Sequence, residues 1–187
     1  SRELRRALAS VRAQPMTDLD VLVVDDASEE NLEAVVVGLG DSRFRHERLS
    51  VKANANVARN RGLELARGDF IAMLDSDDEW LPHHLESRLA ALRDLGCDGV
   101  FGGFRTDDDP PTVYASRPFR PGETMANYLF SDGRAVTPSH VYRAAAAREI
   151  RWDESLRRHQ DLDFSIRFAD RFRFLPCPDV TCVVHRR

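Results

Sequence analysis

The chain has 187 residues, of which 42% are hydrophobic and 31% charged, and it carries a formal net charge of -4. This length and composition fit one globular domain with a sizeable core and argue against a disordered chain. The negative charge argues against the broad basic surface with which proteins bind nucleic acid or an anionic membrane. No apolar run reaches the ~20 residues that cross a bilayer, so we expect no membrane span in this chain.

The three cysteines favour a reducing compartment. Cys97, Cys177 and Cys182 form no CxxC pair and have no histidine at ligand spacing, which argues against a structural zinc site. An odd number of cysteines without a secretory signal is typical of reduced, buried thiols. We therefore expect a cytoplasmic protein.

In the first half of the chain, predicted helices and strands alternate. Leu4, Leu8 and Val11 recur at helical spacing, which predicts an amphipathic helix that ends before Pro15. Short apolar runs bounded by polar residues predict buried strands. The expected elements are helices over residues 2–14, 31–39 (capped by Ser28), 57–67 and 82–95, and strands over 21–24, 44–49, 70–74 and 99–104. This alternation predicts an α/β fold with a mostly parallel central sheet and helices on both faces.

The pattern changes after residue 104. Residues 105–123 are rich in proline and aspartate, which predicts a long excursion or mobile loop. The elements expected beyond it are helices over 125–130, 143–148 and 160–170, and strands over 139–142, 172–175 and 180–184. The second half is therefore expected to be a smaller part with mixed strand directions.

Two of the predicted strands end in clustered acids. The run over residues 70–74 leads into Asp75, Asp77 and Asp78, and the run over 21–24 leads into Asp25-Asp26. The carboxyl ends of parallel strands meet at one edge of a sheet, so these acids are candidates for one composite site. Crowded carboxylates suit Mg²⁺ or Mn²⁺, which bind carboxylate oxygens and leave positions for phosphate oxygens. The simpler alternatives are a solvated acidic turn after residue 74 and a turn or cap at Asp25-Asp26.

Several ordered blocks extend this observation to nearly the whole chain. They are Val-Leu-Val-Val-Asp-Asp-Ala-Ser (21–28), Ala-Arg-Asn-Arg-Gly-Leu (58–63), Leu-Asp-Ser-Asp-Asp-Glu-Trp-Leu-Pro (74–82), Trp-Asp-Glu-Ser-Leu (152–156) and Gln-Asp-Leu-Asp-Phe (160–164). Together they resemble a family 2 glycosyltransferase with the GT-A fold. The resemblance implies one Rossmann-like GT-A domain over residues 1–187, with a nucleotide-sugar-binding half (1–104) and an acceptor-side half (105–187). The first strand of the family would precede Ser1, and its absence should leave two unpaired sheet edges.

The resemblance also implies an activity and its ligands. Such enzymes transfer a sugar, with inversion, from a nucleotide-diphosphate sugar to an acceptor hydroxyl. We expect a UDP-, GDP- or dTDP-linked donor, a divalent Mg²⁺ or Mn²⁺ ion, and an acceptor that is a glycan, a lipid-linked sugar or a small molecule. A lipid-linked acceptor would bring the protein to the inner face of the membrane.

Within the resemblance, six residues receive roles. Asp26 matches the acid that contacts the nucleotide base, with Asp25 beside it, and Arg59 lies near the nucleotide. Asp75 and Asp77 match the first and last acids of the DxD motif, which binds the metal and the phosphates. Asp161 matches the catalytic base, which takes the proton of the acceptor hydroxyl. The simpler alternatives are a surface arginine at position 59 and a helix N-terminal acid at position 161.

Three positions depart from the family pattern. Gln160 stands where the family has Glu before the base, and Asn54 and Asn56 occupy small or glycine positions before the Ala-Arg-Asn block. His185 is one candidate for the C-terminal metal-binding histidine of the family, and the position just after Arg187 is another.

Other classes of protein share parts of the pattern. A receiver domain needs a lysine after its phosphorylated aspartate, but the only lysine, Lys52, precedes Asp75. A dehalogenase-type phosphatase expects Thr or Val where Glu79 stands. A GT-A nucleotidyltransferase and a sugar-nucleotide-binding protein that has lost catalysis, because of Gln160, remain alternatives.

Overall fold

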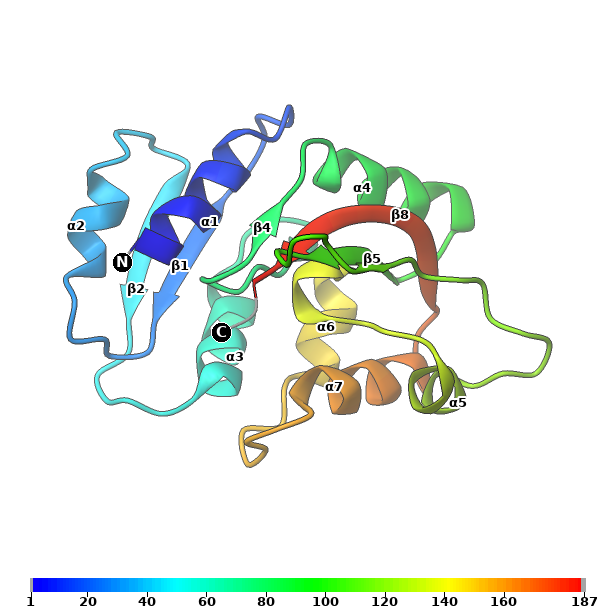
Figure 1. The fold of residues 1–187 in the computed structure, drawn as a ribbon. Helices are drawn as coiled ribbons and strands as arrows, with labels where there is room; N and C mark the ends of the chain where they lie inside the picture. The colour runs from blue at the N-terminus through cyan, green and yellow to red at the C-terminus, as the bar shows by residue number, and fades with distance from the viewer. Residues whose placement is uncertain (1, 186–187) are drawn as a thin grey trace.

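Two β-sheets and their covering helices make up residues 2–185, the part of the chain that the computed structural model describes (Figure 1). In chain order, the helices are α1 (Arg2–Arg12), α2 (Leu32–Val37), α3 (Ala55–Leu65), α4 (His84–Leu95), α5 (Met125–Ser131), the 3-10 turn η1 (Thr137–Ser139), α6 (Ala144–Ile150) and α7 (Gln160–Ala169). The strands are β1 (Val21–Asp25), β2 (Phe44–Arg48), β3 (Phe70–Ala72), β4 (Glu79–Trp80), β5 (Gly99–Thr106), β6 (Val113–Tyr114), β7 (Val141–Arg143) and β8 (Phe174–Val184). The alternation predicted for the first half is confirmed.

The strands form a small parallel sheet and a larger mixed sheet. β1 pairs with β2 in parallel, and the larger sheet has the order β3-β7-β5-β8-β4, with β6 paired to β5. Within residues 2–185, the only parallel pairing of the larger sheet is β5–β8. The α/β class is as predicted, but the larger sheet is mixed rather than mostly parallel. β6 pairs antiparallel with β5 after a hairpin, and β7 pairs antiparallel with β5 after α5. The alternation of helices and strands in the first half of the sequence does not predict these antiparallel pairings.

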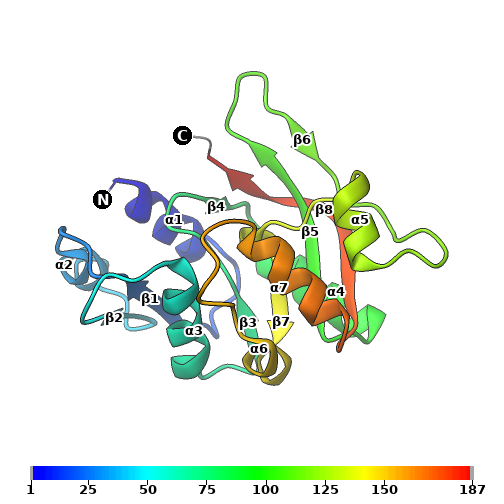
Figure 2. The same ribbon diagram turned by 90° about the horizontal axis from the view of Figure 1, so that it is seen from below.

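β1 and β3 each lie at the end of a sheet, and Figure 2 shows the small sheet set apart from the larger one. Among the described residues, β1 pairs with β2 alone and β3 with β7 alone. Each strand therefore has one edge without a strand partner there, as the resemblance led us to expect. That a family strand precedes Ser1 stays a prediction.

The start of α2 differs from the sequence prediction. Asn31 caps this helix, because its Oδ1 accepts a hydrogen bond from the backbone N–H of Ala34 at 3.0 Å. The predicted cap, Ser28, instead donates its own backbone N–H to Asp25 Oδ1 at 2.8 Å. The hydrogen bond to the Asp25 carboxylate holds Ser28 in a turn after β1. The helix therefore begins after Asn31 rather than after Ser28.

β3 is shorter and less buried than predicted. It spans three residues, and Phe70 at its start is 37% exposed, with the Arg143 guanidinium 5.6 Å from its ring centre. A strand at the end of a sheet has fewer neighbours to cover its side chains, so the prediction of a strand buried on both faces was wrong. At the other end of the chain, the two predicted strands are one continuous strand, β8, whose register on β5 shifts next to Gly103.

Helices cover both faces of the larger sheet, with α4 on one face and α6 and α7 on the other (Figure 1). Two neighbouring residues of β5, Val100 and Phe101, are both fully buried but belong to different clusters. Val100 packs with Leu92 of α4, whereas Phe101 packs with Phe164 of α7. Successive side chains of a strand point to opposite faces, so each face of β5 has its own core.

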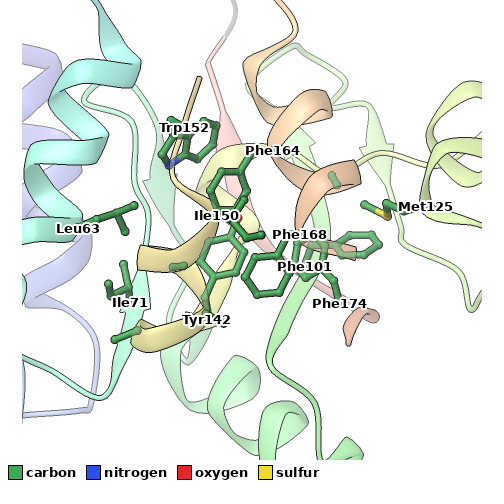
Figure 3. Packing of buried hydrophobic residues seen from close by; sticks show 14 of the residues in the cluster. Leu63, Ile71, Phe101, Met125, Tyr142, Ile150, Trp152, Phe164, Phe168 and Phe174 are labelled. Atoms are coloured by element: carbon green, nitrogen blue, oxygen red, sulfur yellow. The ribbon is translucent and has the colours of Figure 1, made fainter. Parts of the chain in front are cut away.

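The core beneath α7 is largely aromatic (Figure 3). Tyr142 of β7 lies 5.3 Å from Phe164 and 4.9 Å from Phe168, measured between ring centres. Trp152, in the loop before α7, stacks on Phe164 at 4.3 Å. Aromatic side chains bury large apolar areas, so these contacts fix α7 and the loop before it against the sheet.

The proline-rich excursion is partly structured. β6 pairs with Phe104 and Arg105 of β5, and Arg117 makes ion pairs with Glu123 and Asp132. Mobility of this segment stays a prediction. Among residues 2–185, no helix has both the length and the apolar character needed to cross a membrane.

Candidate active site

A pocket of about 270 Å³ lies where α3, the acidic turn after β3, η1 and the start of α7 meet. Its polar lining comprises three acids, Asp75, Asp78 and Asp161, together with Arg59, His159 and Gln160. Val136, Pro138 and Val184 belong to its apolar lining. The fold therefore brings together three of the six predicted site residues, which come from segments up to about a hundred positions apart.

Arg59 links the acidic turn to α7. Its Nη2 donates to Asp75 Oδ1 at 2.8 Å, and its Nη1 donates to Gln160 Oε1 at 3.2 Å. Its guanidinium also lies 4.6 Å from the ring centre of Trp152, and only 14% of its side chain is exposed. The alternative of a solvated surface arginine is therefore wrong.

Gln160 uses both ends of its amide. While Oε1 accepts from Arg59, Nε2 donates to the carbonyl of Leu156 at 3.3 Å. A glutamate at this position would offer only acceptors when ionised. The glutamine therefore links Arg59 to the loop before α7. An ionised glutamate could accept from Arg59 but could not donate to the carbonyl of Leu156.

Asp161 lies in the first turn of α7 and lines the pocket. Burial raises the pKa of its carboxyl group, and the nearby charge of Asp75 acts in the same direction, whereas the Leu162 N–H and Arg59 act against them. The only hydrogen bond of its side chain to residues 2–185 is accepted from the backbone N–H of Leu162, at 2.9 Å. Asp161 therefore keeps acceptor capacity for a ligand. By contrast, Asp163 is paired with Arg167 at 2.6 Å.

The acidic turn carries an additional pocket residue, Asp78. It is 5% exposed, and its Oδ1 accepts the backbone N–H of His185 at 3.0 Å. Burial raises the pKa of Asp78 to about 7, and the charges of Asp75 and Asp77 add to the effect. The sequence singled out the cluster but assigned no role to Asp78. Asp77 is not among the residues that line this pocket, and its backbone carbonyl accepts a hydrogen bond from Arg6.

The chemistry of these donors suits a hard divalent cation. The charges of Asp75 and Asp77 act on Asp78, so three carboxylates are crowded at one turn. Within residues 2–185, no three His, Cys, Asp or Glu side chains are arranged to hold a metal ion by themselves. Mg²⁺ in nucleotide sites commonly takes one or two carboxylates and completes its shell with water and phosphate oxygens. The residues present fit an ion that is shared with a phosphate ligand.

His185 lies beside the acidic turn. Its Nδ1 is 2.8 Å from Asp107 Oδ2, and its Nε2 is 2.6 Å from Glu79 Oε1. Both ring nitrogens thus face carboxylates in this structure. The histidine joins the hairpin after β5 to β4, and metal ligation by His185 or by the position just after Arg187 stays a prediction.

Asp25 and Asp26 do not line this pocket. Asp25 borders a second hollow of about 490 Å³ at the ends of β1 and β2, together with His46 and Arg48. Asp26 Oδ1 accepts the backbone N–H of Ala53 at 2.7 Å and so holds the loop that leads into α3. Neither acid is among the residues that line the first pocket, and the composite site and the nucleotide contacts of these two acids stay predictions.

Sequence reasoning did not predict the asparagines that join α3 to the loop before α7. Asn54 Nδ2 donates to the carbonyl of Glu154, and Asn56 Nδ2 to that of Asp153. Asn60 is 3% exposed, and both ends of its amide bond the backbone of Trp152, at 2.9 and 2.8 Å. The sequence does show three asparagines within seven positions. It does not indicate their hydrogen-bond partners, because these lie about a hundred residues away along the chain.

Comparison with known proteins identifies the family. The model of glycosyl transferase family 2 matches residues 1–159. The chain belongs to this family. The matched stretch ends just before α7, so the role of Asp161 depends on the geometry of the pocket rather than on the match.

Relatives and solved structures agree with this assignment. The amylovoran biosynthesis glycosyltransferase AmsB of Erwinia amylovora is 32% identical over 93% of this chain and 62% of its own length. The Escherichia coli UDP-Glc:alpha-D-GlcNAc-diphosphoundecaprenol beta-1,3-glucosyltransferase WfgD is 33% identical over 52% of this chain and 39% of its own. Residues 1–349 of Staphylococcus aureus TarS, solved with UDP-GlcNAc, have a TM-score of 0.83 at 20% identity, over 100% of this chain and 56% of that one. The GT-A fold is confirmed. The present chain spans about three fifths of the length of AmsB.

Proposed function

We propose that this protein transfers a sugar from a nucleotide-diphosphate sugar to an acceptor hydroxyl with inversion, and that Asp161 is the general base. The observation that carries the proposal is the state of Asp161. Its carboxylate lines the pocket, retains acceptor capacity, and belongs to a helix that aromatic packing holds in place. A raised pKa makes an ionised carboxylate a stronger base, which favours proton transfer from an alcohol.

The reaction needs one base and one leaving group. Asp161 accepts the proton of the acceptor hydroxyl while that oxygen attacks the anomeric carbon. The bond from this carbon to the diphosphate oxygen breaks on the opposite side, so the configuration inverts and a nucleoside diphosphate leaves. A divalent cation held by Asp75 and Asp77 would neutralise the departing diphosphate. Arg59 binds Asp75 and Gln160 at the same time, and so fixes the position of the acidic turn relative to α7.

The comparisons suggest the ligands. TarS was solved with UDP-GlcNAc, and the name of WfgD describes a UDP-glucose donor and a diphosphoundecaprenol-linked acceptor. A UDP-linked donor is therefore our first choice among the UDP-, GDP- and dTDP-linked candidates, with a lipid-linked sugar as acceptor. We place the reaction in the cytoplasm, at the inner face of the membrane. The three cysteines are free and buried, which suits a reducing compartment.

The substitution Asp161→Asn tests the base. It keeps the size of the side chain and removes the proton acceptor, so turnover should fall by roughly 10²- to 10⁴-fold while UDP affinity changes little. Asp163→Asn is the matched control, because Asp163 is an acid on the same helix that is engaged by Arg167. Initial rates with a panel of UDP-sugars and calorimetric titration of UDP provide the two readouts.

Each other outcome has a meaning. If Asp161→Asn and Asp163→Asn are equally active, the base lies elsewhere. If Asp161→Asn loses UDP binding as well as turnover, Asp161 belongs to the donor site. If the native protein binds nucleotide sugars but transfers none to any acceptor, the sugar-nucleotide-binding alternative is correct.

A further inference from the structure

A run of three basic residues lies directly before α7, and its last residue lines the pocket. Arg157, Arg158 and His159 are all exposed, and His159 contributes to the lining. The protein as a whole is negatively charged, and the pocket is lined by three acids. Arg59, the arginine in the lining, is already paired with Asp75, so the basic run adds cationic groups to those of the pocket.

The loop that carries the run is held in place. Asn54, Asn56 and Asn60 of the α3 segment donate to the backbone of residues 152–154, and Arg157 Nη1 donates back to the carbonyl of Ala53 at 3.3 Å. His159 has a φ of +57°, a left-handed conformation that is uncommon for residues other than glycine. Such backbone conformations persist only where the surroundings enforce them, and they cluster at ligand sites.

Two of the three basic side chains have no partner in the described chain. Arg157 donates a hydrogen bond to the carbonyl of Ala53, but neither Arg158 nor His159 makes a side-chain hydrogen bond or ion pair with any of residues 2–185. Lys52, next to Ala53 in the chain, is also exposed and makes no side-chain hydrogen bond or ion pair within residues 2–185. Many other arginines of this protein are ion-paired, including Arg48, Arg59, Arg61, Arg117 and Arg167. Arg158 and His159 are therefore available to a ligand.

We propose that Arg158 and His159 bind a phosphate group of a substrate at the mouth of the pocket. The planar guanidinium matches the spacing of two phosphate oxygens, and an imidazole N–H adds a directed donor. The proposal rests on the proposed glycosyl transfer, in which two substrates can carry phosphate. The donor carries a diphosphate, which we assign to the cation at Asp75 and Asp77. The basic rim borders the pocket next to Asp161, so we expect its phosphate to be the one that links an acceptor sugar to its carrier.

The first test requires no turnover. Inorganic pyrophosphate is titrated into the protein in EDTA, so that metal-bound phosphate does not contribute, and binding is followed by NMR shifts of the backbone amides of residues 157–161, which every variant retains. We expect the double variant Arg158→Gln/His159→Asn to weaken binding by about 10-fold, because it removes two charge-assisted hydrogen bonds. Asn tolerates the left-handed backbone at position 159. Arg93→Gln, which removes an exposed arginine at the far end of α4, should bind as the native protein does.

The second test identifies the source of the phosphate. Transfer is measured to one acceptor sugar in two forms, a short prenyl-diphosphate conjugate and an alkyl glycoside. We expect the double variant to raise KM for the conjugate about 10-fold more than KM for the glycoside, with UDP affinity unchanged. Weaker UDP binding with equal effects on both acceptors would assign the site to the donor diphosphate. Unchanged pyrophosphate binding would overturn the proposal, and absent transfer by a native protein that binds pyrophosphate through Arg158 would overturn only the proposed function.

Discussion

The ends of β1 and β3 have the same sequence pattern but opposite electrostatic environments. Each strand is an apolar run that leads into clustered aspartates. At β1, the side chain of Asp25 is fully buried, accepts the Ser28 N–H at 2.8 Å, and pairs with Arg48 at 2.6 Å. Burial alone would raise the pKa of Asp25, but the Ser28 and Arg48 hydrogen bonds outweigh it and the pKa is lowered. At β3, the pKa of Asp78 is raised to about 7 by burial and by two neighbouring carboxylates.

The difference distinguishes an acid whose charge the chain itself compensates from acids whose charge a ligand can compensate. The charge of Asp25 is satisfied by the chain itself, so this acid stabilises the fold. After β3, Arg59 pairs with Asp75, whereas the pKa of the buried Asp78 is raised by burial and by the charges of Asp75 and Asp77. Repulsion on a buried carboxylate disfavours its ionised form and marks a place where a ligand can supply a compensating charge.

The largest effect is expected at Asp77. Asp77→Asn removes a carboxylate from the proposed cation site, so UDP should bind at least about 10-fold more weakly in Mn²⁺, with little change in EDTA. The melting temperature without metal should not fall, because a repulsive charge is lost. Calorimetry and thermal melts provide the readouts, and Asp94→Asn, an exposed acid on α4, is the control. Equal Mn²⁺ dependence in both variants would show that the acids after β3 hold no cation for the nucleotide.

A smaller effect, on stability rather than binding, is expected at Asp25. Asp25→Asn removes the charge that faces Arg48 and leaves an amide that satisfies only part of the same donors. We expect the free energy of unfolding in urea at pH 7.5 to fall by about 1–2 kcal/mol, a value kept low because the Arg48 side chain is 48% exposed and water can replace its partner. The matched control is Asp26→Asn, because asparagine keeps the Oδ1 that accepts from Ala53. If the two variants unfold alike, Asp25 is not the structural acid we describe.

The smallest effect is a pH dependence. The pKa of Asp25 is lower in the folded state than its ordinary 3.8, so its contribution is complete above that value and is lost as the pH falls through the folded-state pKa. The stability difference between the native protein and Asp25→Asn should therefore shrink as the pH falls from 5 to 3. Urea unfolding of both proteins at several pH values measures it. A difference that grows on acidification would mean that the pKa of Asp25 is raised in the folded state.

Much of the local structure could be predicted from the sequence. The helical spacing of Leu4, Leu8 and Val11 predicts α1, and all three side chains are buried. Apolar runs predict β1 and β5, because burial of such runs is favourable in any fold that contains them. The Asp75 to Asp78 cluster predicts a charged strand end. The sequence by itself thus determined the α/β class, the position of the acids along the chain and, by resemblance, the family.

Only the tertiary structure decided which of these acids meet and in what state. Asp25 and Asp78 follow similar runs, but one faces Arg48 and the other faces Asp75 and Asp77, so their pKa values move in opposite directions. Arg59 reaches Gln160 across about a hundred positions. The asparagines of α3 find their partners in the loop before α7 over a similar separation. Hydrogen bonds and charge interactions act over a few ångströms in space. Periodicity along the chain does not show which residues become neighbours when α3 and α7 pack on the sheet.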